Sequence, residues 1–139
     1  MPLDFAEAIC ESISHAAEDL HMAAIAVFTE SGSTARMISK YRPKARIYAF
    51  TQDPAVCNRM NVLWGVHPVL RKQASSAEEM VATAQKELLR DGVIRAGDVL
   101  GVVAGTKLSS GSTNFLRLHA ITEKEAEGAA PRRLGKKES

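Results

Sequence analysis

Short apolar runs alternate with helical segments along most of this 139-residue chain, and this alternation constrains the fold more than any other feature. The first run, AAIAVF at residues 23–28, is continuous rather than alternating, which is typical of a strand buried on both faces. Further strands are predicted at residues 46–50, 66–70 and 98–105. Strand–helix–strand units impose parallel pairing through right-handed crossovers. The pattern therefore predicts an α/β fold.

Helix signals fill the segments between these runs. An apolar stripe on one helical face predicts a first helix over residues 5–20. Shorter helices are predicted at residues 35–41 and at residues 53–65, the latter opened by an Asp-Pro pair and ended by a glycine. Overlapping capping boxes open a longer helix, predicted over residues 75–90.

The last predicted strand, residues 114–121, alternates between apolar and polar side chains, as a half-exposed edge strand does. The loop before it, residues 106–113, is too short for a crossover helix, so this strand is expected to run antiparallel. The expected architecture is a three-layer sandwich with a five-stranded, mostly parallel sheet, its last strand antiparallel, and helices on both faces. One domain is predicted at residues 1–121. Residues 122–139 lack periodicity and are predicted to be a disordered tail.

Composition excludes several classes of function. Lys and Arg number 18 and Asp and Glu 16, for a net charge of +2, which argues against nucleic acid or a membrane surface as partner. Two cysteines are too few for a disulfide scaffold, and the four histidines lie on separate elements without metal-ligand spacing. Neither a P-loop nor a dinucleotide fingerprint occurs. No run is long enough to span a membrane and no signal peptide opens the chain, so a cytoplasmic protein is expected. Because nucleotide fingerprints and metal-ligand spacing are both lacking, no cofactor or metal is expected in this chain.

The loop after the first strand is a candidate phosphate site, because open α/β sheets bind ligands beyond the carboxyl ends of their strands. Its candidate residues offer hydroxyls, a tight turn and the backbone amides of a helix N-terminus: Thr29, Ser31, Gly32, Ser33 and Thr34. The alternative is a simple strand-to-helix turn in which Ser33 or Thr34 caps the helix. From this loop alone, the capped turn is favoured.

A second loop, between the fourth and fifth strands, is also rich in potential donors. Lys107 supplies positive charge, and the flanking small residues supply backbone and hydroxyl groups: Gly105, Gly111 and Thr113. The alternative is a mobile hairpin connection without a ligand. Two such loops at one sheet edge favour a ligand site more than either loop does by itself.

The string SGSTARMISKYRPKA, followed by WGVHPVL and by GDVLGVVAGTKLSSGSTNFLRLHAI, resembles the C-terminal domain of pyruvate kinases over about residues 5–121. The resemblance implies the same five-stranded fold, and a regulatory domain that binds a phosphorylated effector through the two loops above. It also implies contacts with sister subunits, in a homodimer or homotetramer. Catalysis in the family, with its Mg²⁺ and K⁺, belongs to a separate barrel domain, so this chain alone is not expected to transfer phosphate.

Glu30 stands where some sugar-bisphosphate-activated members of the family carry lysine. A carboxylate there repels phosphate, so the effector stays open between a phosphorylated sugar, a nucleotide monophosphate and none. Two other hypotheses also stay open. One is a stand-alone sensor of small phosphorylated ligands with the same fold, and the other is a structural interface domain without an effector.

Overall fold

A computed structural model of the chain describes residues 5–105 and 113–128. One five-stranded sheet forms its centre, with the strand order β3-β2-β1-β4-β5. The pairs β1–β2, β2–β3 and β1–β4 are parallel, and β4–β5 is antiparallel, as predicted. The strands span β1 Ala24–Phe28, β2 Arg46–Thr51, β3 Val66–Leu70, β4 Val99–Gly105 and β5 Thr113–Ala120.

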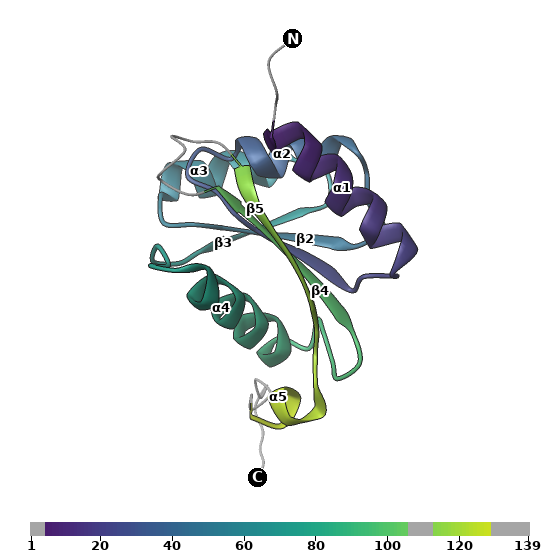
Figure 1. Ribbon diagram of the computed structural model, residues 1–139. Helices are drawn as coiled ribbons and strands as arrows, with labels where there is room; N and C mark the ends of the chain where they lie inside the picture. The colour runs from purple at the N-terminus through teal and green to yellow at the C-terminus, as the bar shows by residue number, and fades with distance from the viewer. Residues whose placement is uncertain (1–4, 106–112, 129–139) are drawn as a thin grey trace.

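Helices cover both faces of this sheet, which confirms the predicted three layers (Figure 1). The helices of one face are α1 Phe5–Asp19, α2 Ser33–Lys40 and α3 Pro54–Arg59, the last continued by the 3-10 turn η1 Met60–Val62. The other face is covered by α4 Ala77–Arg90, with the short α5 Glu123–Gly128 beside it.

The first face holds a core in which α1 lies close against the sheet. Ile13 of α1 is fully buried, together with Ile25 and Val27 of β1. Gly101 of β4 allows the approach, because a Cβ there would lie 2.6 Å from Ile13 Cδ1 and 2.9 Å from Met22 Sδ. A side chain at position 101 would therefore force the buried side chains of Ile13 and Met22 to move.

The second face of the sheet packs against α4, and side chains of the helix start and of the residues just before it cap the N-terminus of α4. Ser76 is the N-cap, and its hydroxyl accepts a hydrogen bond from the backbone N–H of Glu79 at 3.1 Å. The Glu79 carboxylate accepts in return from the N–H and hydroxyl of Ser75. These bonds, the Ser75 hydroxyl first, lower the pKa of Glu79. The predicted capping-box pattern is thus present at this helix end.

The prediction of a disordered tail at residues 122–139 is wrong for the first part of that segment, because residues 123–128 form α5. The hydroxyl of Thr122 accepts from the N–H of Glu125 at 3.1 Å, and the Glu125 carboxylate accepts from the Thr122 N–H at 2.9 Å. This reciprocal capping box starts the helix, and partly buried Ala126 packs against the core of the α4 face. Residues 129–139 lie outside the described residues.

Candidate functional site

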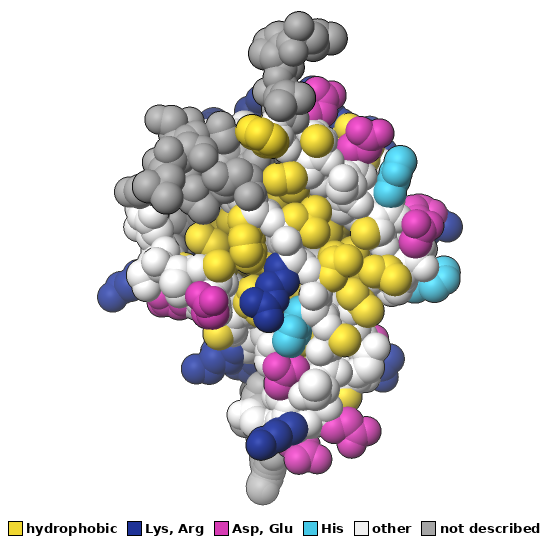
Figure 2. All heavy atoms as spheres, viewed as in Figure 1, with side chains coloured by type: hydrophobic (Ala, Val, Ile, Leu, Met, Phe, Trp, Pro, Cys, Tyr) yellow, Lys and Arg dark blue, Asp and Glu magenta, His cyan; other side chains and the backbone are white. Residues whose placement is uncertain are grey.

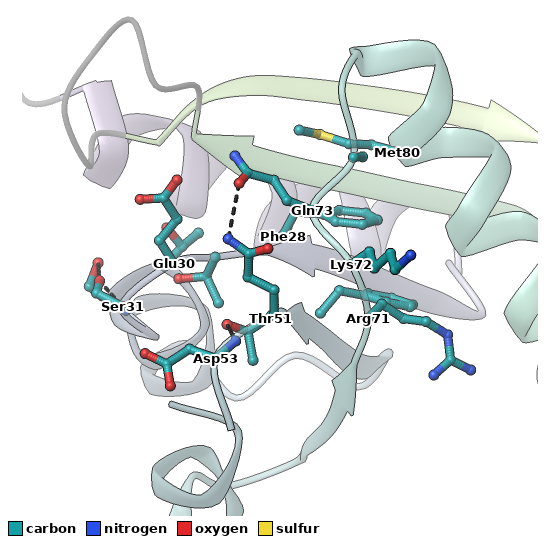
Figure 3. A pocket seen from close by; sticks show the side chains of 15 residues that line it. Phe28, Glu30, Ser31, Thr51, Asp53, Arg71, Lys72, Gln73 and Met80 are labelled. Carbon is teal, nitrogen blue, oxygen red and sulfur yellow. Dashed lines mark hydrogen bonds between the residues drawn. The ribbon is translucent and has the colours of Figure 1, made fainter. Parts of the chain in front are cut away.

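A pocket opens at the carboxyl ends of three parallel strands, β1, β2 and β3 (Figure 3). Its cavity volume is about 350 Å³, which is within the range of small-molecule sites. The wall on one side is the loop after β1, and the wall on the other is the segment after β3. Residues that follow β2 line the pocket between them, and α4 contributes Met80.

The loop after β1 is held by its own hydroxyl groups. Thr29 Oγ1 accepts a hydrogen bond from the backbone N–H of Gly32 at 2.8 Å. Ser31 Oγ accepts from the Ser33 N–H at 3.3 Å and donates to Ser33 Oγ at 3.1 Å. Two backbone amides at the start of α2 therefore already have partners within the loop.

Gly32 is the residue that allows the chain to turn from β1 into α2. It is the N-cap of α2 and has a φ of 89°, in the left-handed region that disfavours side chains. Its α-carbon faces the core, where an added Cβ would lie 3.4 Å from Met60 Cγ and 3.5 Å from Val56 Cγ1. Gly32 thus shapes the loop from behind and does not line the pocket.

The opposite wall carries two cations, Arg71 and Lys72, directly after β3. Arg71 Nη2 forms an ion pair with Glu87 Oε1 at 2.5 Å, and Arg71 Nη1 donates to the backbone oxygen of Leu70 at 2.8 Å. Glu87 lies on α4 and is buried. Lys72 makes no ion pair or hydrogen bond with the described residues, so its positive charge is available at the wall.

Two carboxylates lie on the side of the pocket away from these cations (Figure 3). Asp53 caps α3, where its Oδ1 accepts from the Ala55 N–H at 2.9 Å. Glu30 is exposed, and its carboxylate accepts no hydrogen bond from the described part of the chain. The pocket is therefore bipolar, with acidic groups beside the first loop and basic groups at the end of β3.

The floor between the two walls is apolar. The rings of Phe28 and Phe50 are stacked, with centroids 4.8 Å apart and an interplanar angle of 12°. Met80 adds its side chain from α4. Between the walls, Gln52 Nε2 donates to Gln73 Oε1 at 3.0 Å and so links the segments after β2 and β3. An apolar floor with polar walls suits a small ligand that has one hydrophobic face and several polar groups.

Residues 7–119 match the family model of the pyruvate kinase alpha/beta domain. The chain belongs to the family of pyruvate kinase C-terminal α/β domains. A curated pyruvate kinase of Lactobacillus delbrueckii subsp. bulgaricus is 42% identical over 123 residues, covering 88% of this chain and 21% of that protein. A pyruvate kinase of Bacillus licheniformis is 37% identical over 126 residues, 91% of this chain and 22% of the relative.

A solved structure supports the same family. The crystal structure of a pyruvate kinase from Cryptosporidium parvum matches with a TM-score of 0.77 at 30% identity, over 86% of this chain and 23% of that chain. The chain thus spans only about a fifth of the length of the curated pyruvate kinases that it matches.

Within this pyruvate kinase domain, four of the five candidate residues of the first loop line the pocket: Thr29, Ser31, Ser33 and Thr34. Gly32 lies behind them. The alternative prediction, in which Ser33 or Thr34 caps the helix, is wrong about the capping residue. The N-cap of α2 is Gly32, and Ser33 and Thr34 belong to the first turn of the helix. In the second loop, Gly105 and Thr113 pair where β4 meets β5, at the same sheet edge. Lys107 and Gly111 lie outside the described residues.

Sequence reasoning missed the wall formed by Arg71 and Lys72. The signal was available, because both residues directly follow a strand predicted to be parallel to the first. Their side chains must then lie at the same sheet edge as Thr29. The capping boxes of the segment RKQASSAEE predict a helix start, and they give no sign of the two cations that precede them.

A second hollow lies between α4, β5 and α5, away from this pocket. His119 Nε2 lies 3.1 Å from both carboxylate oxygens of Glu125 and connects β5 with α5. Lys86 of α4 borders the same hollow. Within residues 5–105 and 113–128, no group of three or more His, Cys, Asp or Glu side chains is arranged to hold a metal ion. None of the described helices has the length and apolar character needed to cross a membrane.

Proposed function

We propose that this chain is the regulatory part of a pyruvate kinase and binds a small phosphorylated ligand in the pocket at the ends of β1, β2 and β3. The observation that carries the proposal is the convergence of three polar loops on one cavity of about 350 Å³. Ligands of open α/β sheets bind at this edge. A phosphorylated sugar and a nucleotide monophosphate both have the size and the mixture of polar and apolar surface that such a pocket accepts.

In this proposal the chain itself does not transfer phosphate. Phosphoryl transfer requires Mg²⁺ held by carboxylates next to the transferred group, together with a cationic clamp. The acidic residues of the pocket, Glu30 and Asp53, lie apart from Lys72 and Arg71. In a full-length protein, the catalytic barrel with its Mg²⁺ and K⁺ would occupy the part that corresponds to the remaining length of the related pyruvate kinases.

Calorimetric titration of the 139-residue chain tests ligand binding directly. We expect saturable heat with glucose 6-phosphate, AMP or both, and weaker binding of fructose 1,6-bisphosphate, because its second phosphate meets Glu30 or Asp53. A coupled assay with phosphoenolpyruvate, ADP, Mg²⁺ and K⁺ is expected to show no turnover. Absence of heat with all three ligands would refute the binding role, and turnover in the assay would refute the non-catalytic one.

A second proposed role is contact between copies of the chain through α1 and β5. Hydrophobic side chains gather on the face of the molecule where these two elements lie (Figure 2). Phe5, Leu20 and Leu118 are 62%, 45% and 42% exposed. β5 is also an edge strand, so its outer backbone groups can pair with another strand. These features support a homodimer, and a higher oligomer such as a tetramer requires a further interface.

A further inference from the structure

We infer that the hollow between α4, β5 and α5 is a second binding site, which takes a small monocarboxylate with an apolar body. Its cavity volume is about 410 Å³, within the range of small-molecule sites. The hollow is separate from the pocket at the ends of β1, β2 and β3, because the two cavities share no lining residue among those that the structure describes. The inference therefore does not depend on the proposed function.

One continuous face of α4 forms the first wall of the hollow. Val81 and Leu89 are buried there, and Lys86 is exposed beside them. The lining residues of α4 follow the spacing of a single helical face: Glu78, Val81, Ala82, Gln85, Lys86 and Leu89. This wall therefore combines an apolar base with a cation at its rim.

β5 forms the opposite wall through the side chains on its α4 face. Phe115 packs with the core of that face, whereas Leu116 packs with the core of the α1 face. Side chains of a strand alternate between the two faces of a sheet, so Arg117 and His119 share the face of Phe115. Both line the hollow. Leu118, which we assign to the contact between copies of the chain, lies on the opposite face.

α5 closes one end of the hollow, where the chain leaves β5 (Figure 1). His119 Nε2 lies 3.1 Å from both carboxylate oxygens of Glu125, and the Thr122 N–H donates to Glu125 Oε1 at 2.9 Å. These contacts use both oxygens of Glu125, so we assign this carboxylate to holding α5 in place. α5 also lies beyond residues 7–119, the part that matches the family model, so this end of the hollow is not part of the matched domain.

Two cations of the hollow have no partner in the described part of the chain. Lys86 on α4 and Arg117 on β5 make no ion pair and no hydrogen bond with the described residues. They belong to opposite walls, so an anion between the walls can meet both. The planar guanidinium of Arg117 matches a carboxylate with two parallel N–H donors, and the ammonium of Lys86 adds a point charge.

The carboxylates of the hollow limit the charge of the ligand to a single negative one. Glu78 and Glu125 line the same cavity as the two cations. Glu78 precedes Lys86 by eight residues, about 12 Å along the helix axis, so the two side chains do not form a close ion pair. A phosphate dianion would be repelled by both carboxylates, whereas a monoanion gains from Lys86 and Arg117 with less repulsion. A carboxylate is therefore favoured over a phosphate.

Apolar side chains define the rest of the ligand. Val81, Ala82 and Leu89 offer no side-chain hydrogen bonds, and an apolar chain gains free energy by covering them. Hexanoate is therefore the main probe. Acetate keeps the charge and lacks the chain, and 1-hexanol keeps the chain and lacks the charge.

Titration of the ¹⁵N-labelled 139-residue chain with these three probes, at constant ionic strength, tests the site. We expect hexanoate to give saturable shifts of the backbone amides of Lys86, Leu89, Arg117 and His119. Hexanoate is expected to bind at least about fivefold more tightly than either acetate or 1-hexanol, because only hexanoate supplies both the charge and the chain. Hexanoate shifts confined to other amides, or no saturable shifts, would overturn the inference.

Variants at the two cations test the charge contact. Arg117→Gln is expected to weaken hexanoate about tenfold and Lys86→Gln about threefold, while 1-hexanol changes by less than about twofold. Lys40→Gln is the matched control, because Lys40 is exposed on α2, on the other face of the sheet. It is expected to leave hexanoate within about twofold. All three positions are exposed, so the free energy of unfolding should change little.

Two further results would overturn the site. One is an equal affinity of hexanoate for Arg117→Gln, Lys40→Gln and the unaltered chain. The other is an affinity of 1-hexanol equal to that of hexanoate, which would reduce the hollow to an apolar surface. Either result would leave the proposed function standing, because glucose 6-phosphate and AMP are tested at the segments after β1, β2 and β3.

Discussion

Arg71 Nη2, directly after β3, lies 2.5 Å from Oε1 of Glu87 in the last turn of α4. The ion pair joins the basic wall of the pocket to the helix that supplies the pocket with Met80. The Glu87 side chain is only 9% exposed, whereas that of Arg71 is 40% exposed. The buried carboxylate therefore depends on Arg71 for charge compensation.

Arg71→Met is expected to lower the free energy of unfolding by about 2 kcal/mol, because it leaves the Glu87 carboxylate buried without its cation. The double variant Arg71→Met with Glu87→Met removes both charges and is expected to recover most of that loss. Urea unfolding of the two single variants, the double variant and the unaltered chain measures the coupling. A double variant that is no more stable than Arg71→Met would show that the pair does not stabilise the chain in this way.

Gly32→Ala is expected to lower the free energy of unfolding by about 1–2 kcal/mol, the cost of forcing a side chain into the left-handed region. Gly92→Ala is the matched control, because Gly92 also has a positive φ, of 75°, with nothing within 4 Å of an added Cβ. Both variants are expected to lose similar stability in thermal unfolding, but only Gly32→Ala should also weaken ligand binding. Equal affinities in the two variants would argue against a role of the first loop in the pocket.

The pKa of Glu79 lies below its ordinary value of 4.5, because Ser75 donates two hydrogen bonds to its charged form. A group whose pKa is lowered by folding stabilises the folded chain above its ordinary pKa and loses that contribution as the pH falls through the lowered value. Glu79→Gln is therefore expected to be less stable than the unaltered chain at neutral pH. The difference should shrink as the pH falls below 4.5.

Urea unfolding over a pH series tests this, with Glu78→Gln as the control. Glu78 carries the same charge on the same first turn, but its carboxylate accepts no hydrogen bond from the described residues. A stability difference for Glu79→Gln that stays constant from neutral pH to strongly acidic pH would contradict the capping role.

Leu118→Asp is expected to weaken self-association at least tenfold, because it puts a charge on the exposed face of the edge strand β5. Val62→Asp is the control, since Val62 is 87% exposed but lies on η1, away from β5. Sedimentation equilibrium over a range of concentrations measures the self-association of both variants and of the unaltered chain. A strictly monomeric unaltered chain at high concentration, or equal weakening by both variants, would contradict the proposed interface.

The sheet was predictable from the sequence because its signals are local and agree with one another. The continuous run AAIAVF predicted a central strand, and four of the five residues of β1 are fully buried, from Ala24 to Val27. The short connection before β5 predicted the antiparallel pair. α5 was missed because it has only six residues and no apolar stripe, so its one signal was the pair Thr122 and Glu125.

The pocket was predictable only in part. The Gly and Ser residues of the loop after β1 predicted a turn into a helix, and this loop forms one wall of the pocket. The positions of the uncompensated charges in the pocket could not be predicted from the sequence, because they depend on which cation forms an ion pair in the folded chain. Glu87, 16 residues further along the chain than Arg71, neutralises Arg71 and leaves Lys72 as the available cation of that wall. Such pairing depends on tertiary packing of α4 against the sheet.

The most direct test of the central claim is a map of ligand-induced shifts of backbone amide resonances during titration of the ¹⁵N-labelled chain with glucose 6-phosphate and AMP. The account predicts saturable shifts in the segments after β1, β2 and β3, centred on Ser31, Gln52 and Lys72, with little change in α5. Saturable shifts confined to other parts of the molecule, or none with either compound, would contradict it.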